Sequence, residues 1–182
     1  LFWIMINCNL ILYDLLDKTI NIDFFGDNFI VNYNESDLIE LTRVLNSKVT
    51  KYPMIWLESG YRMVEPVNRG NKTLLLQGCR FFLITKGSQT DYPKTRFSTT
   101  YNELLYTLKE KFIDKIRKSK GISISGTNFT STSLPFNSVS EILTRYGTNN
   151  YDNDSARDNV STDIWDAIVI ECDLLIKTNC YL

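Results

Sequence analysis

The chain has 182 residues, of which 43% are hydrophobic and 23% are charged, and its formal net charge is −1. A chain of this length and composition can bury a full core, which argues against disorder and favours one domain over residues 1–182. The nearly neutral charge gives no overall field that would favour DNA, RNA or an anionic membrane as a partner.

Two features of the composition narrow the range of enzyme chemistry. The chain has no histidine, the side chain most often used as a general base near neutral pH and as a metal ligand. Its four cysteines, Cys8, Cys79, Cys172 and Cys180, form none of the close pairs typical of zinc sites. We therefore predict no catalytic residues, no metal and no cofactor. Cys79 and Cys172 stand within apolar strand patterns and are predicted to be small buried hydrophobic residues.

The first residues of the chain are apolar but do not have the pattern of a membrane segment. Asn7, Asn9 and Asp14 interrupt them well short of the about 18 apolar residues that a membrane span requires. A basic region typical of a secretion signal is also missing. We expect no membrane partner, and a first short helix over residues 10–18.

The next two segments predict a hairpin and then a helix. In residues 21–33, apolar pairs flank Gly26-Asp27-Asn28, which predicts a β-hairpin or a bulged strand. Residues 35–49 carry leucine and valine at helical spacing, with Asn34 or Ser36 as the N-cap candidates.

Two strands are predicted after this helix. Pro53 is expected at the first position of the first strand, because proline cannot donate a ladder hydrogen bond. Trp56 within it, and Trp165 later in the chain, are predicted to lie in the core rather than at an interface. Residues 69–87 predict a central strand that is apolar on both faces. One face is expected to hold Leu75, Cys79, Phe81 and Leu83, and the other Leu74, Leu76, Phe82 and Ile84.

A long helix is predicted from Thr100 to Gly121. Thr100 and Glu103 fit a capping box, and Gly121 fits a C-terminal stop. Basic residues gather toward its end, either as a solvated face that complements the helix dipole or as a patch facing a phosphate backbone. The candidates for that patch are Lys111, Lys115 and Lys118, and the expected buried stripe is Tyr101, Leu104, Leu105, Leu108, Phe112 and Ile116.

Residues 122–160 are rich in serine, threonine, asparagine and glycine, and predict an extended arm or hairpin within the domain. The aromatic residues in this arm have no local apolar partners, which makes them candidates for contact with another subunit. These candidates are Phe129, Phe136, Tyr146 and Tyr151.

The last predicted strand alternates apolar and charged residues. Even-numbered positions from Ile168 to Ile176 form one face, whereas Glu171, Asp173 and Lys177 lie on the other.

Few motifs in the sequence indicate chemistry. A P-loop and a G-x-S-x-G motif are both missing, and the acidic run at 152–158 lacks the glycine and glutamate of a calcium loop. Glu171, Asp173 and Lys177 could serve a metal-dependent nuclease, but their spacing equally fits the outer face of a strand. We predict that the protein is not an enzyme. A nucleic-acid-binding module and a small metal-dependent nuclease are the two alternatives.

Three segments, taken in order, resemble the tail-completion proteins of tailed bacteriophages. "NESDLIELTRVLNSKVTKYPMIWLE" resembles their helix followed by a Tyr-Pro-x-Ile-Trp-Leu strand. "RFSTTYNELLYTLKEKFIDKIRKS" is similar to their long helix. "RYGTN" with "STDIWDAIVIECDLLI" is similar to their late turn and final strand. The set covers most of residues 34–177 and points to tail-completion, tail-terminator or neck-ring proteins, particularly of phages that infect Bacteroidetes.

The resemblance implies an α/β or α+β fold, a mixed or mainly antiparallel sheet packed by two to three helices. It also implies a structural virion protein that works by shape. Copies of the chain would form a ring around the DNA exit channel, about sixfold or twelvefold, because such rings match the symmetry of the portal or tail. Its partners would be the portal or the adjacent connector and tail proteins, with non-specific DNA contact as a further hypothesis. The expected location is the neck or tail of the virion, assembled in the host cytoplasm.

Overall fold

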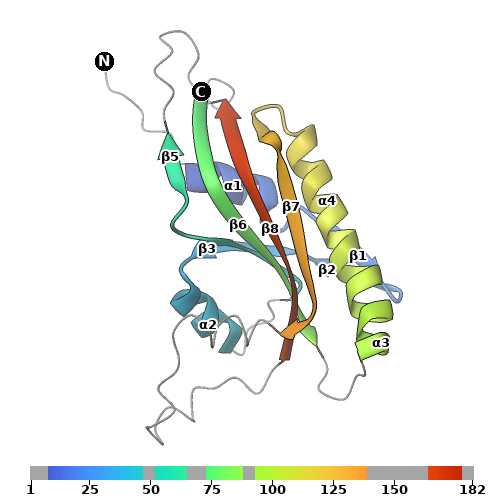
Figure 1. The fold of residues 1–182 in the computed structure, drawn as a ribbon. Coiled ribbons are helices and arrows are strands. Elements are labelled where there is room, and N and C mark those ends of the chain that lie inside the picture. The colour runs from blue at the N-terminus through green and yellow to red at the C-terminus, as the bar shows by residue number, and fades with distance from the viewer. Residues whose placement is uncertain (1–7, 47–51, 65–72, 88–92, 139–163, 178–182) are drawn as a thin grey trace, which may run out of the picture.

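The computed structural model describes residues 8–46, 52–64, 73–87, 93–138 and 164–177. In these ranges the chain has an α+β fold with a six-stranded mixed sheet, a separate two-stranded hairpin and helices packed on the sheet, which confirms the predicted class (Figure 1). In chain order the elements are α1 (Cys8–Leu16), β1 (Asn21–Phe24), β2 (Asp27–Ile30), β3 (Asn32–Ser36), α2 (Leu38–Asn46), β4 (Met54–Glu58), β5 (Arg62–Val64), β6 (Thr73–Gly87), α3 (Pro93–Arg96), η1 (Phe97–Leu105), α4 (Tyr106–Lys118), β7 (Ile122–Ser138) and β8 (Ile164–Lys177).

The sheet is ordered β3-β4-β6-β8-β7, and β5 pairs with the beginning of β6. β3 and β4 are parallel, and the crossover that parallel strands require contains α2. The other pairs named here are antiparallel, and the longest of them joins β6 to β8 at the centre of the sheet. Each of these two central strands therefore has a neighbouring strand on both sides.

Both faces of the sheet carry an apolar cluster, which explains why β6 is apolar on both sides. The larger cluster lies between the sheet and α1, η1 and α4, and includes all six residues of the stripe predicted for the long helix. The smaller cluster lies under α2 and is built from Leu41, Leu45, Met54, Trp56, Phe82, Ile84, Ala167 and Val169. The prediction that Trp56 belongs to the core is confirmed, because its side chain is fully buried.

The predicted faces of β6 are wrong in its first half. Leu74 and Leu76 belong to the larger cluster with Cys79, whereas Leu75 points to the opposite side of the sheet. The reason is an irregularity at Gly78, where φ is +71° and the register with β8 shifts. An extra residue in one strand reverses the alternation of side chains beyond it.

Both predicted helix caps on the N-terminal side are also wrong. Asn34 and Ser36 lie in β3, and the cap of α2 is Asp37, whose Oδ1 accepts a hydrogen bond from the Glu40 N–H at 2.8 Å. The long helical segment begins at Pro93 rather than at Thr100, so Thr100 and Glu103 lie inside it, within the π-helical part η1.

The C-terminal end of α4 uses a serine instead of the predicted glycine. Ser119 has extended backbone angles, and its N–H and its Oγ both donate to the carbonyl of Ile116, at 3.1 and 2.8 Å. Gly121 lies two residues further on, where its carbonyl accepts the N–H of Lys177 at 2.7 Å. The helix therefore ends through a side-chain hydrogen bond rather than a left-handed glycine.

The predicted hairpin is confirmed, with its turn one residue earlier than expected. β1 and β2 pair from Asn21↔Ile30 to Phe24↔Asp27, so Phe25 and Gly26 form the two-residue turn. Their φ angles of 51° and 88° are both positive, as in a type I′ turn.

The first part of the segment predicted as an extended arm or hairpin is a strand of the sheet. Residues 122–138 form β7, which pairs with β8 at the side of the sheet, with register shifts between Ser125 and Thr130 and between Ser133 and Ser138. An edge position suits a polar strand, because only one of its two edges is paired. Residues 139–160 lie outside the described ranges.

Candidate functional site

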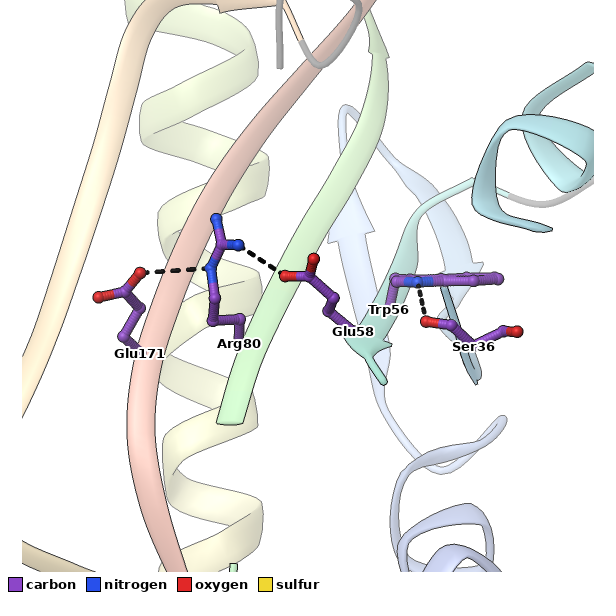
Figure 2. A network of polar contacts seen from close by, with 5 residues as sticks. All are labelled: Ser36, Trp56, Glu58, Arg80 and Glu171. Atoms are coloured by element: carbon purple, nitrogen blue, oxygen red, sulfur yellow. Dashed lines mark hydrogen bonds and ion pairs between the residues drawn. The ribbon is translucent and has the colours of Figure 1, made fainter. Parts of the chain in front are cut away.

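A charged network crosses three neighbouring strands on the face of the sheet that also carries α2 (Figure 2). Arg80 on β6 lies directly opposite Glu171 on β8, and Glu58 is the last residue of β4. The Arg80 Nη1 donates to Glu58 Oε2 at 2.7 Å, and Arg80 Nε forms an ion pair with Glu171 Oε1 at 3.3 Å. The guanidinium also lies 5.4 Å from the centre of the Phe82 ring.

This network connects neighbouring strands through ion pairs. Its one cation lies between two carboxylates, and the Arg80 and Glu58 side chains are only 29% and 20% exposed. Asp173, two residues after Glu171 on the same face, accepts the N–H of Gly78 at 2.7 Å. Glu171 and Asp173, the two carboxylates of the nuclease alternative, therefore bind the Arg80 guanidinium and the Gly78 N–H.

Beside this network, β4, with the sequence MIWLE, is positioned by its tryptophan. The indole N–H of Trp56 donates to the carbonyl of Ser36 on β3 at 3.2 Å (Figure 2). The ring packs under α2, while Ile55 and Leu57 point into the larger cluster on the other face. This strand is an internal support of the sheet rather than the wall of a reactive pocket. The side chain of Trp165 lies outside the described part of the chain, so its core placement stays a prediction.

A tyrosine–glutamate cluster was missed by sequence reasoning. The Glu35 carboxylate on β3 accepts hydrogen bonds from Tyr61 Oη at 2.7 Å and from Tyr33 Oη at 3.5 Å. Burial, and then the negative charge of Glu35, raise the pKa of Tyr33 far above its usual range. Tyr33 is therefore a neutral donor at any physiological pH. Glu35 and Tyr61 are 26 positions apart in the sequence, so no local spacing indicated their contact.

The same cluster closes the outer edge of β3. The backbone N–H of Tyr33 donates to Asp17 Oδ1, and that of Glu35 donates to Asn34 Oδ1, both at 2.9 Å. Tyr13 Oη donates to the same Asn34 oxygen, and burial raises the pKa of Tyr13. Two amides that a further strand would need are thus occupied by side chains, which protects this edge from pairing.

The three lysines predicted as a basic patch lie on α4, and two of them are bound by other groups of the chain; their role at a DNA channel or between rings stays a prediction. Lys111, Lys115 and Lys118 follow the i, i+4, i+7 spacing of one helix flank. Lys111 Nζ donates to the carbonyl of Asn21 at 2.6 Å, and Lys118 Nζ binds Asp114 at 2.5 Å. Lys115 forms no hydrogen bond or ion pair with another residue of the described ranges.

The predicted subunit-contact residues lie where the structure gives no side-chain information. Phe129 and Phe136 belong to β7, whose backbone is described, but their side chains are not. Tyr146 and Tyr151 lie outside the described ranges. Their role in subunit contact stays a prediction.

The two central cysteines are confirmed as buried residues. Cys79 and Cys172 lie directly opposite each other on β6 and β8, and both are free thiols in the larger cluster. Burial raises the pKa of both thiols, that of Cys172 to about 12. Neutral, buried thiols are poor nucleophiles.

Among the described residues, the aromatic side chain with the highest exposed fraction is at the turn of the β1–β2 hairpin. Phe25 is 72% exposed, and Ile30 on the same hairpin is 56% exposed. The ring of Phe25 lies 4.5 Å from that of Phe24, centre to centre, and Phe24 lies 6.4 Å from Phe29. These three rings, Phe24, Phe25 and Phe29, are called the hairpin tip below.

Comparison with known proteins gives no further guide, since no family model, curated protein or solved structure matches the chain. Within the ranges described above, no three or more acidic or cysteine side chains are grouped to hold a metal ion. None of the helices in those ranges is both long and apolar enough to cross a membrane.

Proposed function

We propose that this protein is a structural virion protein, a ring-forming subunit of the head–tail connector or tail-completion complex of a tailed phage. Copies of the chain would surround the DNA channel in the neck or tail, about six or twelve to a ring. The portal or the adjacent connector and tail proteins would be its other partners.

The segments that resemble phage tail-completion proteins support this proposal by their position in the fold. The first segment contains α2 and β4, the second spans η1 and α4, and the last forms β8. These elements supply most of both apolar clusters. The likeness therefore concerns residues that determine the body of the fold, although it carries no catalytic residue with it.

The observation that carries the proposal is the exposed hairpin tip. The chain already has a buried cluster on each face of its sheet, so it does not need Phe25 for its own core. An aromatic side chain left largely in water on a projecting turn is typical of a surface that another protein covers. A subunit of a ring needs such a surface.

Electron microscopy of the purified protein tests the proposal. We expect closed rings with a central channel wide enough for duplex DNA, about 20 Å or more across. Separate single chains at every concentration would contradict the proposal, as would magnesium-dependent cleavage of DNA that is lost in Glu171→Ala. Purification at high and low salt provides the control for non-specific charge-driven association.

A further inference from the structure

The turn of the β1–β2 hairpin has two features that the isolated chain does not explain. Phe25 adopts a positive φ of 51°, a conformation that favours asparagine or glycine over a bulky residue. Its ring is also 72% exposed. Strain and exposure at one aromatic residue indicate that the side chain is used in a contact outside its own fold.

The hairpin tip has an acidic border. Asp23 and Asp27 are exposed on either side of Phe24 and Phe25. Neither carboxylate forms an ion pair or hydrogen bond with another residue of the described ranges. The surface is thus an aromatic centre with two free negative charges around it, the arrangement of an interface core with a charged rim.

A matching surface of opposite charge lies on the other side of the sheet. Val64, Leu75 and Leu175 lie side by side across β5, β6 and β8, on the face opposite the larger cluster, and each is partly exposed. We call these three residues the sheet strip. The helix on this face, α2, packs further along the strands, against Trp56, Phe82 and Ile84.

The border of the sheet strip is basic. Arg62 and Lys177 lie two residues beyond Val64 and Leu175 on the same face, and both are exposed. Neither side chain forms an ion pair with another residue in the described part of the chain. Asp173, also on this face, is bound by the Gly78 N–H, whereas the cationic ends of Arg62 and Lys177 have no ion-pair partner among the described residues.

We infer that the hairpin tip of one copy docks on the sheet strip of the next copy of this chain, an inference that rests on the proposed ring. The exposed ring of Phe25 would cover the apolar strip, and Asp23 and Asp27 would face Arg62 and Lys177. The hairpin packs on the larger-cluster side of the sheet, through Ile22, and the strip lies on the opposite side. Two different surfaces on opposite sides give a head-to-tail contact, which closes into a ring if the rotation allows. Figure 1 shows the hairpin extending past α4, at the opposite side of the view from β5.

Charge reversal on each surface tests this contact. One variant combines Asp23→Lys with Asp27→Lys, and the other combines Arg62→Glu with Lys177→Glu. Each alone should require at least a tenfold higher concentration for half-assembly, measured by mass photometry, because like charges then meet across the contact. An equal mixture of the two should restore rings of the wild-type stoichiometry with both variants in equal numbers.

A third variant is the matched control. Asp14→Lys with Glu103→Lys changes two exposed positions on α1 and η1 that belong to neither surface, and shifts net charge as much as Asp23→Lys with Asp27→Lys does. It should assemble like the wild type. Circular dichroism of all three variants shows that loss of assembly is not loss of folding.

The possible outcomes separate the docking contact from the ring itself. If wild-type rings form and both reversed variants assemble equally well, the docking contact is wrong and the ring proposal stands. If each variant loses assembly but the mixture does not recover, the two surfaces do not bind each other and the inference is also wrong. A wild-type protein that stays a single chain at all concentrations overturns the ring proposal, and the docking contact with it.

Discussion

Arg80 connects three strands through side chains that only a folded sheet brings together. It reaches Glu58 on β4 and Glu171 on β8, and its guanidinium covers Phe82. A partly exposed ion pair of this kind contributes about 1 kcal/mol or less, because water screens the charges. Its main effect is to hold the end of β4 in register with β6, beside the buried Trp56.

Replacing Arg80 with methionine should lower the free energy of unfolding by about 1 kcal/mol. Methionine retains an apolar stem over Phe82, so the loss reports chiefly the Glu58 carboxylate left without its cation. The matched control is Arg43→Met, since Arg43 binds Glu40 at 3.0 Å on the exposed surface of α2. Urea unfolding should show a change below about 0.5 kcal/mol for the control. Equal losses in the two variants would show that the network has no special role.

The buried thiols of Cys79 and Cys172 should lower the free energy of unfolding as the pH becomes alkaline. The pKa of the Cys172 thiol rises from 9.0 to about 12 on folding, and that of Cys79 also rises, so the folded state holds these protons more tightly than the unfolded state. Their contribution to stability is complete below about pH 9 and is lost as pH rises toward 12. Urea unfolding should therefore show a decline across this window.

The double variant Cys79→Ala with Cys172→Ala separates the thiols from the tyrosines, whose raised pKa values act in the same direction. Its unfolding free energy should decline less steeply between pH 9 and 11 than that of the wild type. Identical slopes would show that the thiols do not contribute.

At the scale of elements, periodic patterns predicted the long helix, the hairpin and the central strands, but not β5 and not where each helix begins. The apolar stripe from Tyr101 to Ile116 identified the long helix, because tertiary packing selects residues at helical spacing. Its start was misplaced at Thr100, since a capping box inside a helix has the same sequence as one at an end. Proline fits the first turn of a helix, and Pro93 marks the true beginning.

The N-cap of α2 gives a direct test of element ends. Asp37→Ala removes the acceptor of the Glu40 N–H and should destabilise the protein by about 1 kcal/mol. Ser36→Ala changes a neighbouring residue with the same sequence signal but keeps the backbone carbonyl that binds Trp56, so it should cost less than about 0.5 kcal/mol. Thermal and urea unfolding of both variants measure the difference. A larger loss of stability in Ser36→Ala than in Asp37→Ala would show that Ser36, not Asp37, caps the helix.

Contacts between elements could not be predicted from the sequence. The register of β6 depends on the irregularity at Gly78, which reverses the sides of Leu74, Leu75 and Leu76. The sheet strip exists only because Leu75 turns away from the larger cluster. Arg80, Glu58 and Glu171 likewise come from three strands, so no spacing within one segment could indicate their network.

At the scale of the whole molecule, the sheet divides two surfaces of different character. One side is covered by α1, η1, α4 and the hairpin, and the other is covered by α2 over only part of its length. The edge at β3 is closed by side chains from Asp17 and Asn34. We propose that the remaining surfaces, the acidic hairpin tip and the basic sheet strip, are where copies of the chain meet.

Native mass spectrometry of the purified protein tests the central claim most directly, because it counts the chains in one particle. The ring proposal predicts a dominant species with six or twelve times the mass of one chain, in agreement with a closed head-to-tail contact. A single chain as the only species, from micromolar to the highest soluble concentration, would contradict it.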